Sequence, residues 1–179
     1  MSRLRTALIV PVPEAAPAVD PWRERTCADR PSAGVPAHVT VLFPFVPATE
    51  IDDRLIDDLR ALFAEHRSFS FELREPRRFP GVLYLAPEPA EPFLELVHAA
   101  ALRFPELPPY GGEIPLASIV PHLTVAHGEP ALLDEAEAEM RPLLPIRTAA
   151  DEVVLLEELE PDWGRWEPRA ALPLGSTPV

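Results

Sequence analysis

PAHVTVLFPFVP (residues 36–47) and VPHLTVAHG (residues 120–128) are two apolar segments built on the same pattern. Each contains a His-x-Thr tripeptide, His38-Val39-Thr40 in the first and His122-Leu123-Thr124 in the second. Apolar, β-branched runs of this kind are typical of strands, and a strand places residues i and i+2 on the same face of its sheet. We therefore expect each segment to present one imidazole and one hydroxyl on one side of a sheet.

The presence of two tripeptides is stronger evidence for a functional site than either copy alone. Five His and seven Thr placed at random in 179 residues would give roughly 0.2 His-x-Thr matches. One such histidine is more often structural than catalytic, because folds usually satisfy their buried polar groups. Two imidazoles suit acid/base chemistry at a phosphodiester: one of His38 and His122 takes a proton from the attacking oxygen, and the other donates one to the leaving oxygen. The hydroxyls of Thr40 and Thr124 can hold the non-bridging oxygens.

The rest of the chain is expected to alternate short strands and helices. Its 25 prolines disfavour long helices, and no linker divides the chain, so residues 1–179 are expected to form a single two-lobed domain. A turn is expected near Glu75-Pro76. The expected strands are 4–12, 37–43, 69–74, 78–85, 119–127, 151–160 and 165–174, and the expected helices are 18–28, 49–66, 91–104 and 129–140.

Composition restricts the partners. There are 16 basic residues, all arginine, and 29 acidic ones, which gives a net charge of −13. Long duplex nucleic acid is bound through clustered cations, so it is disfavoured, although a single phosphate is not. The lone Cys27 excludes an internal disulfide and a cysteine-based zinc site. The apolar run at 7–12 is too short for a signal peptide or membrane span. We expect a cytoplasmic monomer with no membrane partner.

The two His-x-Thr segments, 84 residues apart, resemble those of the two-histidine phosphoesterase superfamily, in particular bacterial 2′-5′ RNA ligase-like proteins. ALIVPVPEA near the start, RFPGVLYLAP and PPYGG in the middle, and GRWEPRAALPLG near the end extend the resemblance over the chain. It implies a bilobed α+β fold, in which two pseudo-symmetric antiparallel sheets face a central cleft and helices pack outside. It also implies chemistry on cyclic phosphodiesters or 2′-5′ linkages without a metal or nucleotide cofactor.

Further side chains are candidates for substrate contact. Aromatic rings near the segments could stack on a base, and arginines could meet a phosphate. His127, five residues after His122, is expected on the opposite face of its strand by parity. The aromatic candidates are Phe45, Tyr84, Tyr110 and Trp166, and the basic ones are Arg77, Arg78 and Arg169.

The leading hypothesis is a metal-independent phosphoesterase that hydrolyses a small or RNA-terminal cyclic phosphodiester of the 2′,3′-cyclic phosphate type. Its catalytic pair is His38 and His122, and its phosphate-binding residues are Thr40 and Thr124. No metal or cofactor is expected, and the partner is a small cyclic nucleotide or an RNA terminus. The alternatives are an ATP-independent 2′-5′ RNA ligase, or the reverse cleavage, and a non-catalytic module that binds a nucleotide or RNA end.

Overall fold

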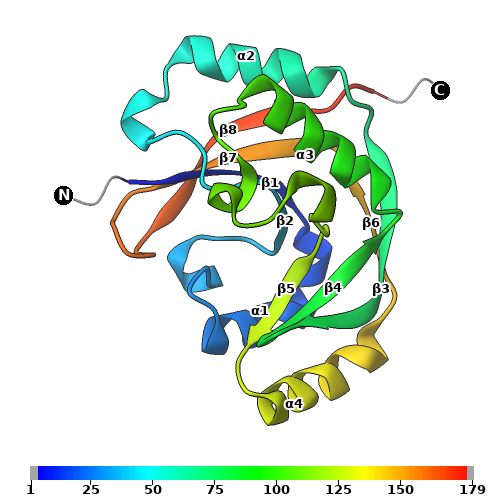
Figure 1. The fold of residues 1–179 in the computed structure, drawn as a ribbon. Coiled ribbons are helices and arrows are strands. Elements are labelled where there is room, and N and C mark those ends of the chain that lie inside the picture. The colour runs from blue at the N-terminus through cyan, green and yellow to red at the C-terminus, as the bar shows by residue number, and fades with distance from the viewer. Residues whose placement is uncertain (1–3, 177–179) are drawn as a thin grey trace.

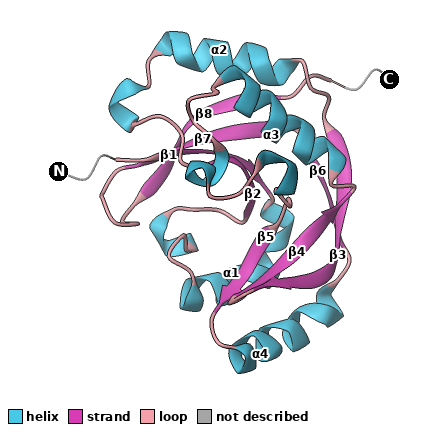
Figure 2. Ribbon diagram, viewed as in Figure 1, coloured by secondary structure: helices cyan, strands magenta, loops and turns pink. Residues whose placement is uncertain are grey.

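Two four-stranded antiparallel sheets form the protein in a computed structural model that describes residues 4–176 (Figures 1 and 2). The strand orders are β2-β1-β7-β8 and β5-β4-β3-β6. The edge strand β2 contains the first His-x-Thr tripeptide, the edge strand β5 begins directly after His122 of the second, and the two strands lie against each other. The first sheet comprises β1 (Thr6–Pro11), β2 (His38–Leu42), β7 (Glu152–Glu158) and β8 (Trp166–Pro173), and the second comprises β3 (Phe69–Phe79), β4 (Val82–Glu88), β5 (Leu123–His127) and β6 (Ile146–Ala150).

Each of the two edge strands β2 and β5 is packed by a helix from the other half of the chain. Helix α1 (Ala16–Thr26) packs on β5, and α3 (Glu91–Arg103) packs on β2. Helix α2 (Asp53–Ala64) covers β8, and α4 (Pro130–Met140) covers β4 and β5. The two strands that carry the tripeptides are therefore held together by helices crossing between the lobes as well as by their own contact. This arrangement confirms the expected α+β fold with helices outside two antiparallel sheets.

Several elements differ from the sequence-based expectation, among them β5, which begins at Leu123 and not at residue 119. Helix α2 begins at Asp53 because the Asp52 carboxylate accepts the backbone N–H of Leu55 at 2.8 Å, so Thr49 lies in a preceding 3₁₀ turn. The expected turn at Glu75-Pro76 is wrong, because β3 continues through these residues to Phe79. Strand β6 was not expected, since its half-exposed sequence IRTAA has little apolar signal.

A β-bulge interrupts the alternation of β2. Ile9 of β1 pairs with Thr40, whereas Leu8 pairs with Leu42, so Val41 is the extra residue. Val41 and Leu42 are both buried in the core, although neighbours in a regular strand face opposite sides. The strict alternation expected over residues 37–43 is therefore wrong beyond Thr40. The bulge returns Phe43 to the face of the sheet that carries the tripeptide.

Strand β5 has the same bulge at the equivalent place. Tyr84 of β4 pairs with Thr124 and Leu83 pairs with Ala126, so Val125 is the extra residue. Val125 and Ala126 are both buried, and the parity of the strand changes after them. His127 therefore returns to the face of Thr124, which corrects the expectation that it points away. Phe43 and His127 occupy equivalent positions in the two halves.

Gly34 closes the turn that leads into β2 and approaches the backbone of β8. Its φ is +86°, and a Cβ built there would lie 2.1 Å from the carbonyl oxygen of Trp166. The Gly34→Ala substitution is therefore expected to lower the free energy of unfolding by about 3 kcal/mol or more, because the backbone must move apart. Gly111→Ala is the matched control, since Gly111 has φ +64° but open space around it, and it should cost only about 1–2 kcal/mol. Urea denaturation measures both, and equal losses would contradict the close-approach argument.

Candidate active site

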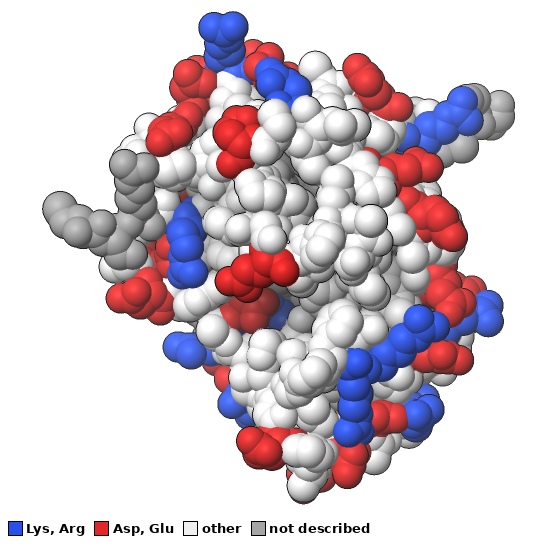
Figure 3. Space-filling model, viewed as in Figure 1, with Lys and Arg blue, Asp and Glu red and all other residues white. Residues whose placement is uncertain are grey.

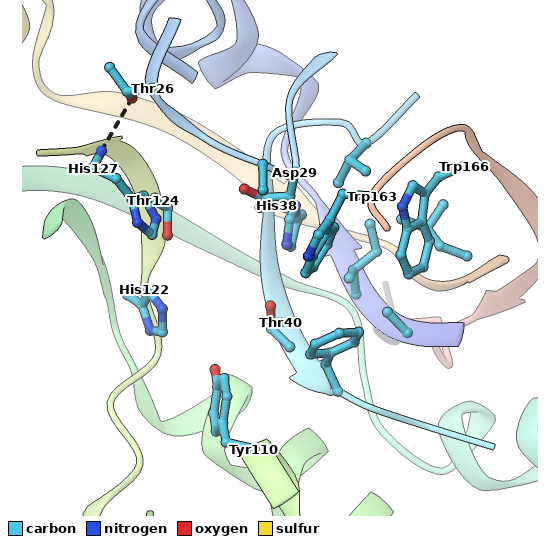
Figure 4. Close-up of a pocket in the computed structure, with 16 residues that line it drawn as sticks. Thr26, Asp29, His38, Thr40, Tyr110, His122, Thr124, His127, Trp163 and Trp166 are labelled. Carbon is cyan, nitrogen blue, oxygen red and sulfur yellow. Dashed lines mark hydrogen bonds between the residues drawn. The ribbon is translucent and has the colours of Figure 1, made fainter. Parts of the chain in front are cut away.

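A cavity of about 430 Å³ lies between the lobes where β2 meets β5. Figure 4 shows His38 and Thr40 entering it from one strand and His122 and Thr124 from the other. The tripeptide side chains thus converge on one space, as the family resemblance implies, and within each tripeptide His and Thr share a face, as their spacing predicts. The cavity is lined by Ala7, Ile9, Thr26, Ala28, Asp29, Val35, His38, Thr40, Phe43, Tyr110, His122, Thr124, His127, Leu156, Trp163 and Trp166.

The two imidazoles are anchored in the same way. Nδ1 of His38 lies 2.7 Å from the carbonyl oxygen of Pro36, and Nδ1 of His122 lies 2.8 Å from the carbonyl oxygen of Val120. A carbonyl oxygen only accepts hydrogen bonds, so Nδ1 must carry the proton in each ring. Nε2 is then the lone-pair nitrogen of the neutral imidazole, and it is the atom left to exchange protons with a ligand.

Burial and nearby charges set the protonation of this pair. Burial is the largest influence and lowers the pKa of both His38 and His122 below the ordinary value of 6.5. Asp29 acts against it and raises both pKa values, while the proximity of His122 lowers the pKa of His38. A proton on one ring therefore disfavours a proton on the other. Acid/base catalysis requires one neutral and one protonated imidazole.

Tyr110 and Trp166, two of the aromatic candidates, line the cavity. Burial raises the pKa of Tyr110 to about 12, against a weaker hydrogen-bonding interaction with Thr40, so the phenol stays protonated. Tyr84 lies one layer behind: its ring stacks on Phe79 and meets the His122 ring edge-on, with centroids 5.6 Å apart. Tyr84 thus supports the orientation of the His122 ring.

The other candidates lie away from the cavity. The side chain of Phe45 is 4% exposed and packs edge-on against Phe104 in the core, so the expectation that it contacts the substrate is corrected. Arg78 donates to Asp134 and Glu137 of α4. Two further arginines are exposed near carboxylates, Arg77 by Glu75 and Glu88, and Arg169 by Glu157. The structure does not bring these three arginines to the tripeptides.

The cavity has an aromatic wall on the side of the first sheet. Phe43, Trp163 and Trp166 form it, with ring centroids 5.5–6.5 Å apart. The Arg5 guanidinium packs 4.2 Å from the Trp163 ring and pairs with the buried carboxylate of Glu158. Trp166 is 3% exposed, and its Nε1–H has no hydrogen-bond partner among the described residues. Leaving this buried donor unpaired costs stability.

Several cavity residues escaped sequence reasoning. Phe43 and His127 were missed because two bulges change the strand parity, and the repeated apolar pair after each Thr was the signal available. Asp29 and Trp163 lie in loops, where no periodicity applies. Figure 4 shows the backbone N–H of His127 donating to the Thr26 hydroxyl, a 3.2 Å bond that ties α1 to β5.

The described residues hold no cluster of three His, Cys, Asp or Glu side chains arranged for a metal ion. Chemistry without a metal stays a prediction. None of the helices in residues 4–176 combines the length and apolar composition needed to cross a bilayer.

Paired His-x-Thr strands on either side of a cleft, within a two-sheet α+β fold, define a two-histidine phosphoesterase architecture. The sequence profile of the 2′-5′ RNA ligase superfamily matches residues 11–162, and the chain belongs to this superfamily. No curated protein matches the chain significantly.

Solved structures agree with this fold. TT0787 of Thermus thermophilus superimposes with a TM-score of 0.65 at 23% identity, covering 97% of this chain and 100% of that one. E. coli LigT in its apo form gives a TM-score of 0.62 at 18% identity, covering 97% and 99%. LigT complexed with 3′-AMP gives 0.58 at 17% identity, with the same coverage. At these identities the likeness establishes the fold alone.

The anchoring of the two rings makes a spectroscopic prediction. At pH 7.5 the imidazoles of His38 and His122 should be neutral and protonated at Nδ1, because burial lowers their pKa values and backbone carbonyls accept from Nδ1. Long-range ¹H–¹⁵N correlation spectra of ¹⁵N-histidine-labelled protein report tautomer and titration together. Nε2-protonated rings, or two pKa values above 6.5, would contradict this arrangement.

Proposed function

We propose that the protein is a metal-independent phosphoesterase that hydrolyses a small or RNA-terminal cyclic phosphodiester, with His38 and His122 as its acid/base pair. The observation that carries this proposal is the equivalent anchoring of the two imidazoles at one cavity. Thr40 and Thr124 come from the same strands and line the same space.

The chemistry follows from the protonation states. The neutral imidazole accepts a proton at Nε2 from a water molecule, whose oxygen forms a bond to phosphorus. The bond from phosphorus to one ribose oxygen breaks, and the protonated imidazole gives its Nε2 proton to that oxygen. The product is a phosphate monoester with a free hydroxyl. The Thr40 and Thr124 hydroxyls donate to the non-bridging oxygens as negative charge develops there.

The aromatic wall supports a nucleoside as the organic part of the substrate. Phe43 and Trp163 offer ring faces, and base stacking on such faces contributes about 1–3 kcal/mol per base. E. coli LigT was solved with 3′-AMP, ATP and NADP+, which also supports a nucleotide-sized ligand.

Charge disfavours a long nucleic acid. A short row of basic side chains lies over the β3 region in Figure 3, interspersed with acidic ones. Arg74, Arg77 and Arg78 of β3 each have a carboxylate within 4 Å, which weakens their attraction for a phosphate backbone. A cavity of about 430 Å³ has room for the end of a nucleic-acid strand.

Ligation of 2′-5′ ends, or its reversal, is the alternative enzymatic activity, and the superfamily to which the chain belongs favours it. It requires RNA to be held along the cleft. Titration of tRNA binding against salt distinguishes the two activities, because a ligase should bind tRNA with a marked salt dependence. A protein that binds cyclic nucleotides without converting them would instead be a binding module.

Removing either imidazole should abolish most of the activity. His38→Ala and His122→Ala are each expected to lower kcat by about 10² to 10⁴ because each removes one proton transfer. The measurement is turnover of a panel comprising 2′,3′-cyclic nucleotides, oligonucleotides with cyclic phosphate ends and ADP-ribose cyclic phosphate.

His98→Ala is the matched control, since His98 lies on an exposed position of α3, and it should retain wild-type rates.

Wild-type kcat/KM should show a bell-shaped pH dependence that rises as one imidazole deprotonates and falls as the other does. Full activity in both cavity variants, or a flat profile between pH 5 and 8, would refute the two-histidine mechanism.

A further inference from the structure

The charges that line the cavity are unusual for a phosphate site. Among the described lining residues, Asp29 is the one carboxylate and no arginine is present. Outside the two tripeptides, the polar side chains of the lining include Thr26, His127 and Tyr110. Figure 4 shows Asp29 beside His38, with its carboxylate directed across the cavity toward the β5 side. A bound phosphate must therefore lie near a negative charge.

Asp29 is held in place by a buried arginine. Arg23 of α1 is 1% exposed, and its guanidinium donates to the backbone carbonyl oxygens of Asp29 and Val35. Its closest carboxylate is Asp20, at 2.9 Å, whereas the carboxylate of Asp29 lies 4.0 Å away. The guanidinium thus fixes the backbone of the loop and is mainly neutralised by Asp20. The charge of Asp29 remains directed at the cavity.

We infer that Asp29 is a specificity residue, which makes the site prefer singly charged phosphodiesters to doubly charged phosphate monoesters. The inference rests on the proposed function and deepens it. It assigns the ligand class by charge: a cyclic or linear diester with one negative charge is accepted, and its monoester product is repelled.

The physical basis is Coulomb repulsion in a partly desolvated space. A phosphate monoester carries close to two charges above its second pKa of about 6, whereas a diester carries one. Two like charges a few ångströms apart repel strongly when the effective dielectric constant is near 20, a value typical of pairs near a protein surface. The second charge of the product therefore weakens its binding, and this promotes product release.

Asp29 also influences the pKa values of the two imidazoles, His38 and His122. The groups that face the two imidazoles are Asp29 and Arg23 from α1 and its following loop, His127 from β5, and the Tyr110 hydroxyl from the loop before β5. Of these, Asp29 raises the pKa of both His38 and His122. Its neutralisation should lower both values, so the whole bell-shaped profile of kcat/KM should move to lower pH.

The test compares Asp29→Asn with Asp20→Asn. Both variants remove one carboxylate near Arg23, but only the first removes charge from the cavity lining. The probes are adenosine 3′-monophosphate and its methyl ester, which differ by about one charge at pH 8. Calorimetry at low ionic strength gives the ratio of their dissociation constants. We expect wild type to favour the methyl ester, Asp29→Asn to shift the ratio about tenfold toward the monoester, and Asp20→Asn to keep the wild-type ratio.

Asp29→Glu is the control for a structural effect of substituting this residue. It retains the negative charge, so it should retain the wild-type ratio of dissociation constants. The inference is overturned if wild type binds the monoester as tightly as the methyl ester, or if Asp29→Asn and Asp20→Asn shift the ratio equally. These affinities do not depend on turnover. A wild-type protein that shows the expected ratio but hydrolyses no cyclic phosphodiester would refute the proposed function and leave the charge selectivity standing.

Discussion

β2 and β5 are edge strands of different sheets, and the cavity exists because these two edges lie against each other. Each edge is secured by a helix from the other half of the chain, α3 on β2 and α1 on β5. Neither lobe alone could assemble the site, since each supplies one imidazole and one hydroxyl. The two β-bulges act at the same level of the strands, where they bury two successive apolar residues and return the next side chain, Phe43 or His127, to the cavity. The lobes are thus similar in backbone and different in side chain.

Because the equivalent positions carry different side chains, the cavity has an aromatic side and a polar side. On the first lobe, Phe43 joins Trp163 and Trp166 in an aromatic wall, whereas on the second lobe the equivalent position is the polar His127. The tripeptides lie between them and are nearly identical in their backbone anchoring. A ligand with a planar apolar end and a compact anionic end matches this division. Burial lowers the pKa values of the two imidazoles, and Asp29 raises them. The same carboxylate therefore favours the protonated imidazoles and repels a second negative charge on the ligand.

The shared face of each His and its Thr could be predicted because its signal is local, whereas the meeting of the two tripeptides at one cavity depends on the packing of β2 against β5 and was implied only by the family resemblance. Within three residues the i, i+2 parity of a strand is dependable, so His38 and Thr40 had to share a face, as did His122 and Thr124. Beyond the tripeptide the parity fails at bulges whose apolar residues, Val-Leu and Val-Ala, give no polar contrast to mark them. Asp29 could not be predicted because its position depends on long-range contacts of Arg23 with carbonyl oxygens. Phe45 was misplaced because an aromatic residue after a strand can face either the core or the cleft, and its packing on Phe104 is not visible in the sequence.

The central claim is that both imidazoles act on one phosphorus atom. A crystal structure of the protein with a nucleoside and vanadate, which adopts the five-coordinate geometry of the reacting phosphorus, tests this most directly. We predict one vanadate in the cavity, with Nε2 of His38 and Nε2 of His122 about 2.7–3.2 Å from oxygens on opposite sides and the Thr40 and Thr124 hydroxyls on the equatorial oxygens. Vanadate held by one histidine alone, or bound outside the cavity, would contradict the account.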